Sequence, residues 1–330
     1  MTENSVQIAW LALVALASIA GCSADIAPSS PDTGLPLNDG TDSGDPCTST
    51  VLCWDAPIAD VGNLVSVWAS SPDDVWMAGP HTLVHLDGDT WTTIEPPTPE
   101  DLHSLWGTGP DDIWAVAGSA NSSGAVLHYD GASWSTVDIG PQVAPVVDIH
   151  GFTTDAGVQQ LWAVGNGGLI HAEDGVWTTT SIPQTSFHGV HADGSGQAFA
   201  GGHSAAFKWG GENWEQDEAW TANVLGGYYV VKSVWSSGLD TWAVGTGVAR
   251  RTNGTWEREA IPVTTRLERV WGSAADDIWA VGGAGLVLHY DGNEWTTVEV
   301  GAESQLLGVY GAGASDVWIV GYEGVFHGHL

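Results

Sequence analysis

From about residue 64 onward the chain repeats itself, and this repeat restricts the possible fold more than any other feature. The segment LERVWGSAADDIWAVGGAGLVLHYDGNEWTTVEV at 267–300 recurs in looser form at 102–139 and again at 64–96. Each copy has an aromatic residue or histidine that closes its first apolar run, and these markers lie 36 to 44 residues apart. The markers are Trp68, Trp106, His150, His191, Trp235, Trp271 and Tyr310. A period of about 40 residues with four short apolar runs is typical of β-propeller blades, because one small antiparallel sheet cannot bury both faces alone.

Each repeat is interpreted as four strands. The second strand carries an aromatic residue in every copy, and the fourth opens on a tryptophan in six of them. The hairpins between third and fourth strands contain Asp87-Gly88, Asp130-Gly131, Asn253-Gly254 and Asp291-Gly292. These pairs tolerate the positive φ of tight hairpin turns. No segment after the leader has a sustained helical period, so the chain is predicted to be all-β.

The last repeat is incomplete, and a segment near the N-terminus can complete it. The chain stops at Leu330 before a fourth-strand tryptophan, whereas Trp54 precedes Leu64 by 10 residues, within the spacing found between the other repeats. Pairing this segment with the last repeat would close the ring and remove two exposed sheet edges. We therefore expect a seven-bladed β-propeller of four-stranded blades over 47–330, closed by an N-terminal strand around Trp54.

The N-terminal residues resemble the leader of a bacterial lipoprotein. The apolar run at 8–21 is too short to span a bilayer, and Ile19-Ala20-Gly21-Cys22 is similar to a lipobox. The resemblance implies a signal peptide at 1–21 and a lipid on Cys22, followed by a tether at 22–46 that is rich in Pro, Ser, Gly and Asp. The preceding MTENSVQ has no Lys or Arg, which a start codon assigned too far downstream would explain. A plain secretory signal in place of the lipoprotein leader also stays open. Either alternative exports the chain, to the cell envelope or as a secreted protein.

With Cys22 lipidated, Cys47 and Cys53 are the remaining pair of cysteines. In an oxidising compartment they are expected to form a short-loop disulfide. Two cysteines are too few ligands for a metal site, and we expect neither a metal nor another cofactor.

The charge balance excludes one class of partner. Forty acidic residues face seven basic ones, which gives a net charge of −33. Such a surface repels phosphates, so we expect no nucleic-acid binding. It suits a solvated protein outside the cell, and we expect a monomer that meets the membrane only through its lipid anchor.

The repeat DIWAVGGAGLVLHYDGNEW resembles the Asp-box (BNR, sialidase-type) propeller superfamily, and within it the seven-bladed photosystem II assembly factor-like proteins. The Ser or Thr that precedes the Asp of a full Asp box is replaced here, for example by His85, His128 or His289. Tectonin-type lectins are a second, weaker resemblance. Sialidases need three arginines that converge from several blades, whereas all five arginines of this chain lie at 250–269. A glycosidase is therefore the least favoured function, and no residue supports a reaction.

A second column of polar residues recurs once per repeat. Third strands carry His85, His128, His171, Lys208, Arg251, His289 and His327, and second strands carry Asp74, Asp112, Gln160, Gln197, Asp240, Asp277 and Asp316. Sites repeated around a ring are too far apart to chelate one ion. We therefore expect structural hydrogen bonds within or between blades.

Functional residues are expected where the repeat is broken, on the face shared by the loops that join second to third strands and successive blades. The connection 215–230 is the longest and carries Trp220, Tyr228 and Tyr229. Together with His203 and Tyr322 these are the candidate ligand-binding residues, although the aromatics of the insertion could instead fold back onto a blade. The expected function is a non-enzymatic binding or scaffold role at the cell envelope, with recognition of a protein or glycan through one face of the ring. A tectonin-like lectin and a structural surface protein without a specific ligand are the alternatives.

Overall fold

The computed structural model describes residues 53–54, 62–119, 124–140, 145–203, 205–220, 224, 230–238 and 240–329. The chain divides into two compact units, Met1–Thr33 and Gly34–Leu330, and all described residues belong to the second. The leader, Cys22, the tether and Cys47 lie outside the described residues, as do Tyr228 and Tyr229.

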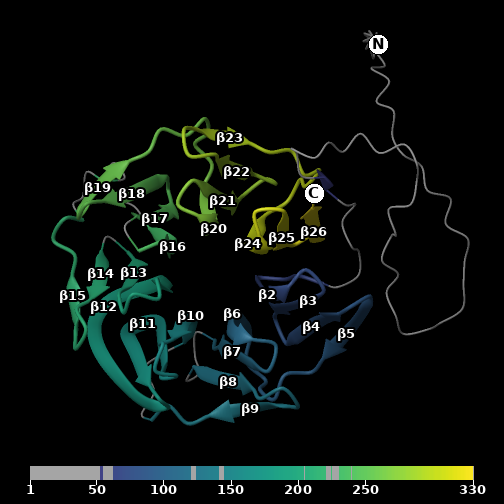
Figure 1. Cartoon of the computed structure of the whole chain (residues 1–330), viewed down its shortest axis with the longest axis vertical. Helices are drawn as coiled ribbons and strands as arrows, with labels where there is room; N and C mark the ends of the chain where they lie inside the picture. Colours follow the sequence, from purple (N-terminus) through teal and green to yellow (C-terminus); the bar gives the residue numbers. More distant parts are fainter. Residues whose placement is uncertain are drawn as a thin grey trace, which may run out of the picture. The chain divides into compact units, whose positions relative to one another are not determined.

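The described strands form six antiparallel sheets (Figure 1). The first two contain β2 (Ser66–Ser71), β3 (Asp74–Gly79), β4 (Thr82–Asp87) and β5 (Thr90–Ile94), and then β6 (Leu102–Gly109), β7 (Asp112–Ala117), β8 (Ala125–Tyr129) and β9 (Trp134–Val137). The third contains β10 (Val146–Thr153), β11 (Gln159–Glu173), β12 (Val176–Ala192), β13 (Ala198–Gly202), β14 (Ala206–Trp209) and β15 (Trp214–Gln216). The fourth and fifth contain β16 (Val231–Ser236), β17 (Asp240–Gly245), β18 (Val248–Thr252) and β19 (Thr255–Arg258), and then β20 (Leu267–Ala274), β21 (Asp277–Gly282), β22 (Val287–Tyr290) and β23 (Trp295–Thr297). The sixth contains β24 (Leu306–Gly313), β25 (Asp316–Gly321), β26 (Gly324–His329) and β1 (Cys53–Trp54).

The prediction of seven four-stranded blades is wrong. Five sheets have four strands, but the third has six, because β12 runs without interruption for 17 residues. Its first part pairs with β11 and its second part with β13, so the third and fourth repeats share one sheet. The link between the two repeats, TTTSIPQTS, stays paired with β11 to its end, with Ser181 opposite Gly168 and Ser186 opposite Asn166. Because β11 holds it in the ladder, its backbone continues as strand and does not leave the sheet as a loop.

The expected contribution of the N-terminal segment to ring closure is present. Strand β1 pairs antiparallel with β26, with Cys53 opposite His329 and Trp54 opposite Gly328. The innermost strands contact one another in the closed series β2, β6, β10, β12, β16, β20 and β24, and they surround a common axis (Figure 1). No described helix is long and apolar enough to cross a membrane.

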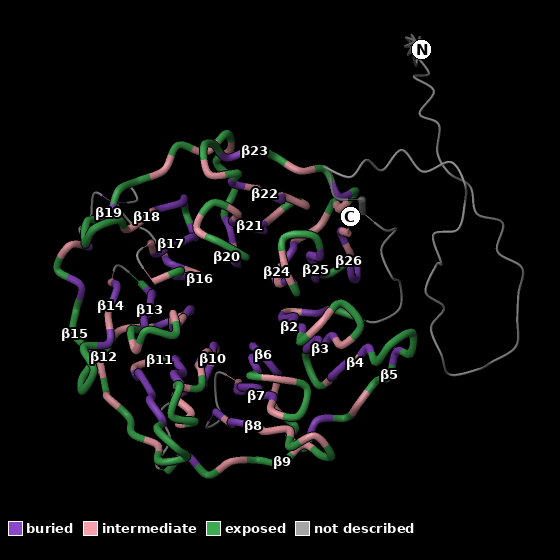
Figure 2. The backbone as a smooth tube through the Cα atoms, in the orientation of Figure 1, coloured by how far each residue is buried: buried purple, intermediate pink, exposed green. Residues whose placement is uncertain are grey.

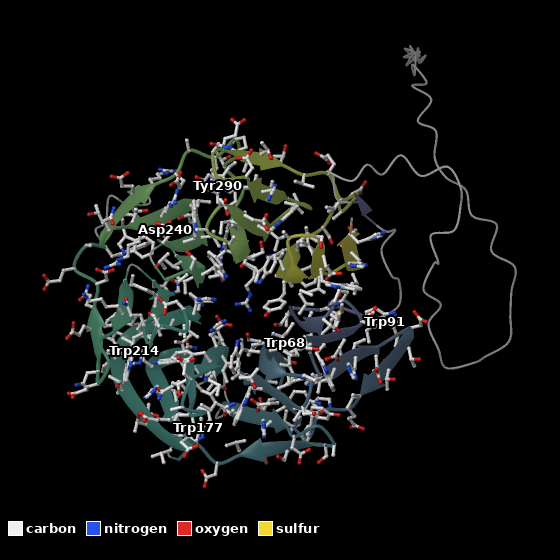
Figure 3. The ribbon with its side chains drawn as sticks, in the orientation of Figure 1. Trp68, Trp91, Trp177, Trp214, Asp240 and Tyr290 are labelled. Carbon is white, nitrogen blue, oxygen red and sulfur yellow. The ribbon has the colours of Figure 1, made fainter. Side chains whose placement is uncertain are left out.

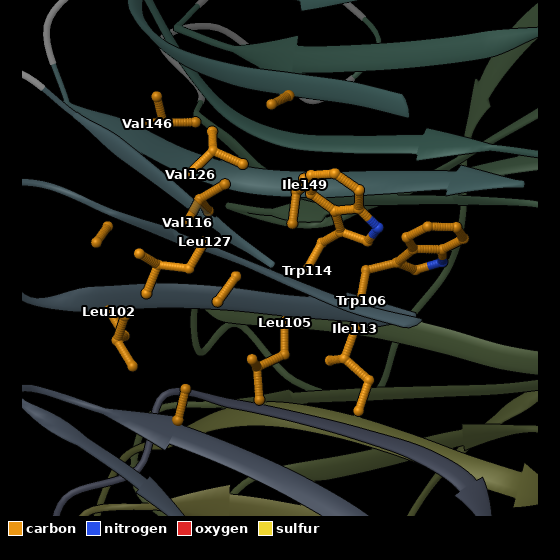
Figure 4. Close-up of a cluster of buried hydrophobic side chains, with 14 of the residues drawn as sticks. Leu102, Leu105, Trp106, Ile113, Trp114, Val116, Val126, Leu127, Val146 and Ile149 are labelled. Atoms are coloured by element: carbon orange, nitrogen blue, oxygen red, sulfur yellow. The ribbon is translucent and has the colours of Figure 1, made fainter. Parts of the chain in front are cut away.

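The apolar core lies between neighbouring sheets, where buried side chains form several clusters. In Figure 2 the buried residues, in purple, lie mainly along the strands. Figure 4 shows part of one cluster, in which Leu105 and Ile113 lie on the strands that also carry Trp106 and Trp114. The tryptophan columns join the sheets, since a second-strand indole packs on the fourth-strand indole of a neighbouring sheet. The pairs are Trp76–Trp134, Trp114–Trp177, Trp242–Trp295 and Trp318–Trp91, with ring centroids 5.5 to 6.1 Å apart. Figure 3 shows Trp68 close to the axis, with Trp91, Trp177 and Trp214 further out.

Candidate functional site

In five of the seven repeats the polar column forms the predicted hydrogen bonds within a sheet. His85 lies 2.7 Å from Asp74 and stacks on Trp76 at 3.9 Å, so its ring has a carboxylate at its edge and an indole on its face. His128 with Asp112, His289 with Asp277 and His327 with Asp316 repeat this arrangement at 2.7 to 2.9 Å, and His171 bonds Gln160 at 2.6 Å. Among the described residues, no group of three or more His, Cys, Asp and Glu is arranged to hold a metal ion.

One member of that column differs from the sequence interpretation. Arg250, not Arg251, pairs with Asp240 at 2.9 Å and also donates to Tyr290 (Figure 3). Arg251 donates instead to Asp217 at 3.0 Å. The reason is register: Arg250 lies opposite Trp242 in the ladder between β17 and β18, the position that the histidines occupy elsewhere.

Trp220 does not form an exposed binding surface. It is 6% exposed and packs edge-on against Trp256, with ring centroids 4.8 Å apart. Its backbone N–H bonds Asp217, whose carboxylate also accepts from Trp256 and Arg251. The described part of the long connection therefore folds back onto the sheet, and Trp220 is corrected from ligand candidate to core residue.

His203 and Tyr322 are both exposed and lie on the face where the innermost strands begin. His203 contacts His188 at 3.3 Å, and the backbone of Tyr322 donates to Gln305, just before β24. These two candidates surround a site whose central residues the sequence interpretation did not name.

That site is formed by β-bulges. In six innermost strands the pairing register shifts by one residue, near the strand start in five of them and at Phe187/Gly189 inside the long strand β12. Each shift leaves one residue outside the ladder. These bulge residues are His103, Val147, His188, Lys232, Glu268 and Leu307. All six line one cavity of about 200 Å³, together with Val65 and Arg269, and we call this cavity the axial mouth. Bulges redirect side chains in this way and are common next to functional sites.

The axial mouth has mixed charge in a strongly acidic chain. The carboxylate of Glu268 forms ion pairs with Lys232 at 3.7 Å and with Arg266 at 3.2 Å. It also accepts a hydrogen bond from the side-chain amide of Gln305 at 3.1 Å. Burial raises the pKa of Glu268, and Arg266 and Gln305 only partly oppose that effect. Three of the seven basic residues of the chain, Lys232, Arg266 and Arg269, are thus gathered here.

His188 of the mouth is a neutral group at neutral pH. Burial lowers the pKa of His188 to about 4, and the neighbouring His203 and Arg266 act in the same direction. His103 bonds the backbone carbonyl of Gly118 at 2.7 Å, which holds its ring in place. Neutral imidazoles can donate one hydrogen bond and accept another, a combination suited to peptide groups.

An ion pair spans the axis directly behind the mouth. Asp148 on β10 accepts from Arg269 on β20 at 3.0 Å, from the hydroxyl of Ser104 at 2.6 Å and from the backbone N–H of Val190 at 2.9 Å. Ser66 accepts from the backbone N–H of Leu105 at 3.0 Å. This network joins five innermost strands, β2, β6, β10, β12 and β20, and fixes the floor of the mouth.

The bulge residues left a signal in the sequence that could have been used. They lie three positions before each marker, where the repeats read Val, His, Val, His, Lys, Glu and Leu, whereas the position just before them is apolar in every repeat. A variable position inside a regular repeat is free of the packing that fixes its neighbours. This break in the repeat lies within the strands, whereas the sequence interpretation placed functional residues on the loops.

Comparisons with known proteins define the fold. No protein-family model matches the chain, and no curated protein matches its sequence. The chain is similar to a structure described as YCF48 bound to D1 peptide, with a TM-score of 0.64, 17% identity and coverage of 84% of this chain and 95% of that one. It is also similar to YCF48 from Cyanidioschyzon merolae (TM-score 0.65, 13% identity, 84% and 98% covered). A third match is the extracellular domain of the putative hybrid two component system BT3049 from B. thetaiotaomicron, with a TM-score of 0.62 and 12% identity. The match covers 82% of this chain and 40% of that one. At these identities the likeness shows a β-propeller, and the Asp-box assignment stays a prediction.

Proposed function

We propose that the chain is a non-enzymatic binding protein of the cell envelope that recognises a segment of a protein partner at the axial mouth. The observation that carries this proposal is the convergence of six bulge residues from six strands on one cavity. These side chains lie outside the ladders that hold the ring together. Their chemistry is varied, with two imidazoles, one cation, one carboxylate and two apolar groups, as recognition of a particular partner requires.

The size of the mouth favours a protein segment over a free small molecule. Its volume of about 200 Å³ is below the range of roughly 300 to 1,000 Å³ that drug-sized ligands occupy. One or two side chains of a peptide fit such a space, with the rest of the peptide on the surrounding face near His203 and Tyr322. The similar structure described as YCF48 bound to D1 peptide supports a peptide ligand on this fold.

The serine and histidine groups of the sheets support a role without catalysis. In nucleophilic catalysis by a Ser-His-Asp triad, the histidine lies between the serine and the aspartate so that it can take the hydroxyl proton. Here the aspartate lies in the middle: Asp277 accepts from both Ser273 and His289, and Asp74 from both Ser70 and His85. A hydroxyl bonded to a carboxylate that is already paired lacks the basic imidazole it would need.

The test uses peptides as defined probes. We expect a random peptide library displayed on phage to yield sequences that bind the purified chain, and Lys232→Glu to weaken that binding at least about tenfold by placing a like charge beside Glu268. Arg258→Glu is the matched control, because it changes charge by the same amount on the exposed surface of β19. A library that yields no binder, or binders that tolerate Lys232→Glu as well as Arg258→Glu, would contradict the proposal.

The envelope location has its own test. The lipobox-like Ile19-Ala20-Gly21-Cys22 motivates it, as does the similarity to extracellular domains of B. thetaiotaomicron. Mass spectrometry of the mature N-terminus should find a lipid-modified Cys22. Cleavage at another residue, or an unmodified cysteine, would refute lipid anchoring.

A further inference from the structure

A second cavity lies on the axis next to the mouth, and its lining differs from that of the mouth. It has a volume of about 230 Å³ and is lined by the residues that follow the bulges along the innermost strands. Arg269 lines both cavities, so the two adjoin there. We call this space the axial cavity.

Two histidines present hydrogen-bond donors to the axial cavity. The Nδ1 atom of His150 accepts the backbone N–H of Ala192 at 3.2 Å, and the Nδ1 atom of His191 accepts that of Ser236 at 3.1 Å. A neutral imidazole that accepts at Nδ1 carries its hydrogen on Nε2. Within the described residues no group accepts a hydrogen bond from either Nε2, and both residues line the cavity. The two rings lie side by side, with centroids 3.9 Å apart.

The carboxylate of the same cavity is already engaged. Asp148 is that carboxylate, and its two oxygens take three hydrogen bonds, from Ser104, Arg269 and Val190. It therefore does not reach the two imidazole Nε2 atoms, and a ligand group with acceptors alone would satisfy both donors.

We propose that the axial cavity binds a small carboxylate through the Nε2–H groups of His150 and His191. The carboxylate oxygens accept one hydrogen bond from each ring, and the guanidinium of Arg269 supplies positive charge at the boundary with the mouth. This proposal does not depend on peptide recognition at the mouth, because a free small acid can supply the carboxylate. The carboxylate of a peptide is a second possible source.

The charges around the site permit an anion in spite of the acidity of the chain. Lys232, Arg266 and Arg269 surround the entrance, opposed by Glu268 and Asp148, which leaves a local formal charge of 3 − 2 = +1. Burial lowers the pKa of His191 to about 3 and that of His150 well below its ordinary value, so both rings are neutral at neutral pH. They donate hydrogen bonds without adding charge that would have to be desolvated.

The experiment is a titration of the ¹⁵N-histidine-labelled chain with sodium acetate at neutral pH, followed by the NMR resonances of the imidazole nitrogens. Binding predicts saturable shifts of the Nε2 signals of His150 and His191, while the Nε2 of His128, which is bonded to Asp112 away from the cavity, stays unchanged. His191→Asn keeps an oxygen to accept the Ser236 N–H but removes the Nε2–H, and should weaken acetate binding about tenfold. His191→Gln, whose amide nitrogen can replace Nε2, should weaken it less.

Further probes separate the sources of the carboxylate. Short acetylated peptides with a free or an amidated C-terminus are titrated beside acetate, and shifts produced by acetate or by the free acid alone both support the site. Shifts that stay linear, that are shared by His128 or that sodium chloride reproduces equally would overturn the carboxylate assignment. Because the wild-type titration uses no mouth variant and acetate is not a peptide, its outcome is independent of the test of peptide binding.

Discussion

The ion pair across the axis offers the sharpest test of how the ring is held. Arg269 on β20 and Asp148 on β10 are 121 residues apart in sequence, and their contact joins opposite parts of the propeller. Arg269→Met removes the guanidinium while keeping a side chain of similar length. Asp148 then keeps its bonds from Ser104 and Val190 but loses the compensating charge.

The expected loss follows from the burial of the pair. The side chains of Asp148 and Arg269 are 5% and 18% exposed, so the surviving carboxylate would be buried without an opposite charge. Removing one partner of a buried pair costs about 3 to 5 kcal/mol. The two remaining hydrogen bonds place the expected loss near the lower end, about 3 kcal/mol. At roughly 2 to 4 °C per kcal/mol for a domain of this size class, the melting temperature should fall by about 6 to 12 °C.

The assay is thermal and urea unfolding followed by tryptophan fluorescence, on Arg269→Met, Asp148→Asn and the double variant. The double variant should recover much of the loss, because it leaves no unpaired charge, and the cycle isolates the coupling between the two residues. A loss below about 1 kcal/mol for Arg269→Met, the range of exposed pairs, would refute the reasoning. Such a small loss would mean that water in the axial cavity screens the charges of Arg269 and Asp148.

Three further predictions concern the rest of the ring. Asp277→Ala should destabilise the fold by about 1 to 3 kcal/mol in urea unfolding, because His289 loses its buried partner; a further effect of a chelator on the variant or on the wild type would contradict the structural interpretation. Acidification from pH 6.5 to about 4 should lower the free energy of unfolding, since the folded-state pKa values of His188, about 4, and His191, about 3, lie below the ordinary 6.5 and the unfolded chain binds protons first. Variants with Gln at these two positions should flatten that pH dependence, and an unchanged slope would refute it. Deletion of residues 47–57 should expose the edge of β26 and cause a lower melting temperature or aggregation in light scattering, and an unaltered melting temperature would show that pairing at Trp54 is dispensable.

Local repetition made much of the fold predictable. A tryptophan that recurs at one register must pack in the same way each time, and a carboxylate opposite a histidine in several repeats must bond it, so both columns were found from the sequence. The fusion of two repeats through β12 could not be found, because it depends on whether a threonine-rich link continues a strand or leaves it. The number of residues between the markers His150 and His191 is the same whether the link continues the strand or leaves the sheet as a loop.

The candidate site was harder to predict for a similar reason. Trp220 lies on the longest connection, but the length of a connection does not say whether its side chains point to solvent or back onto the sheet. Trp220 points back because it packs on Trp256 of the neighbouring sheet. The bulge that exposes Lys232 and Glu268 is a property of strand pairing, which appears only when two strands are aligned. The assignment of Arg251 to the polar column failed in the same way, by one residue of register.

The bulges have a consequence for how such a protein can change. A residue outside its ladder contributes no cross-strand pair, so strand pairing does not fix its side chain. The six positions from His103 to Leu307 can therefore change while the tryptophan columns and the ion pair preserve the scaffold, with Lys232 and Glu268 changing together because they contact each other. A designer who grafts new side chains at these six positions would alter what the propeller recognises without having to redesign how it folds.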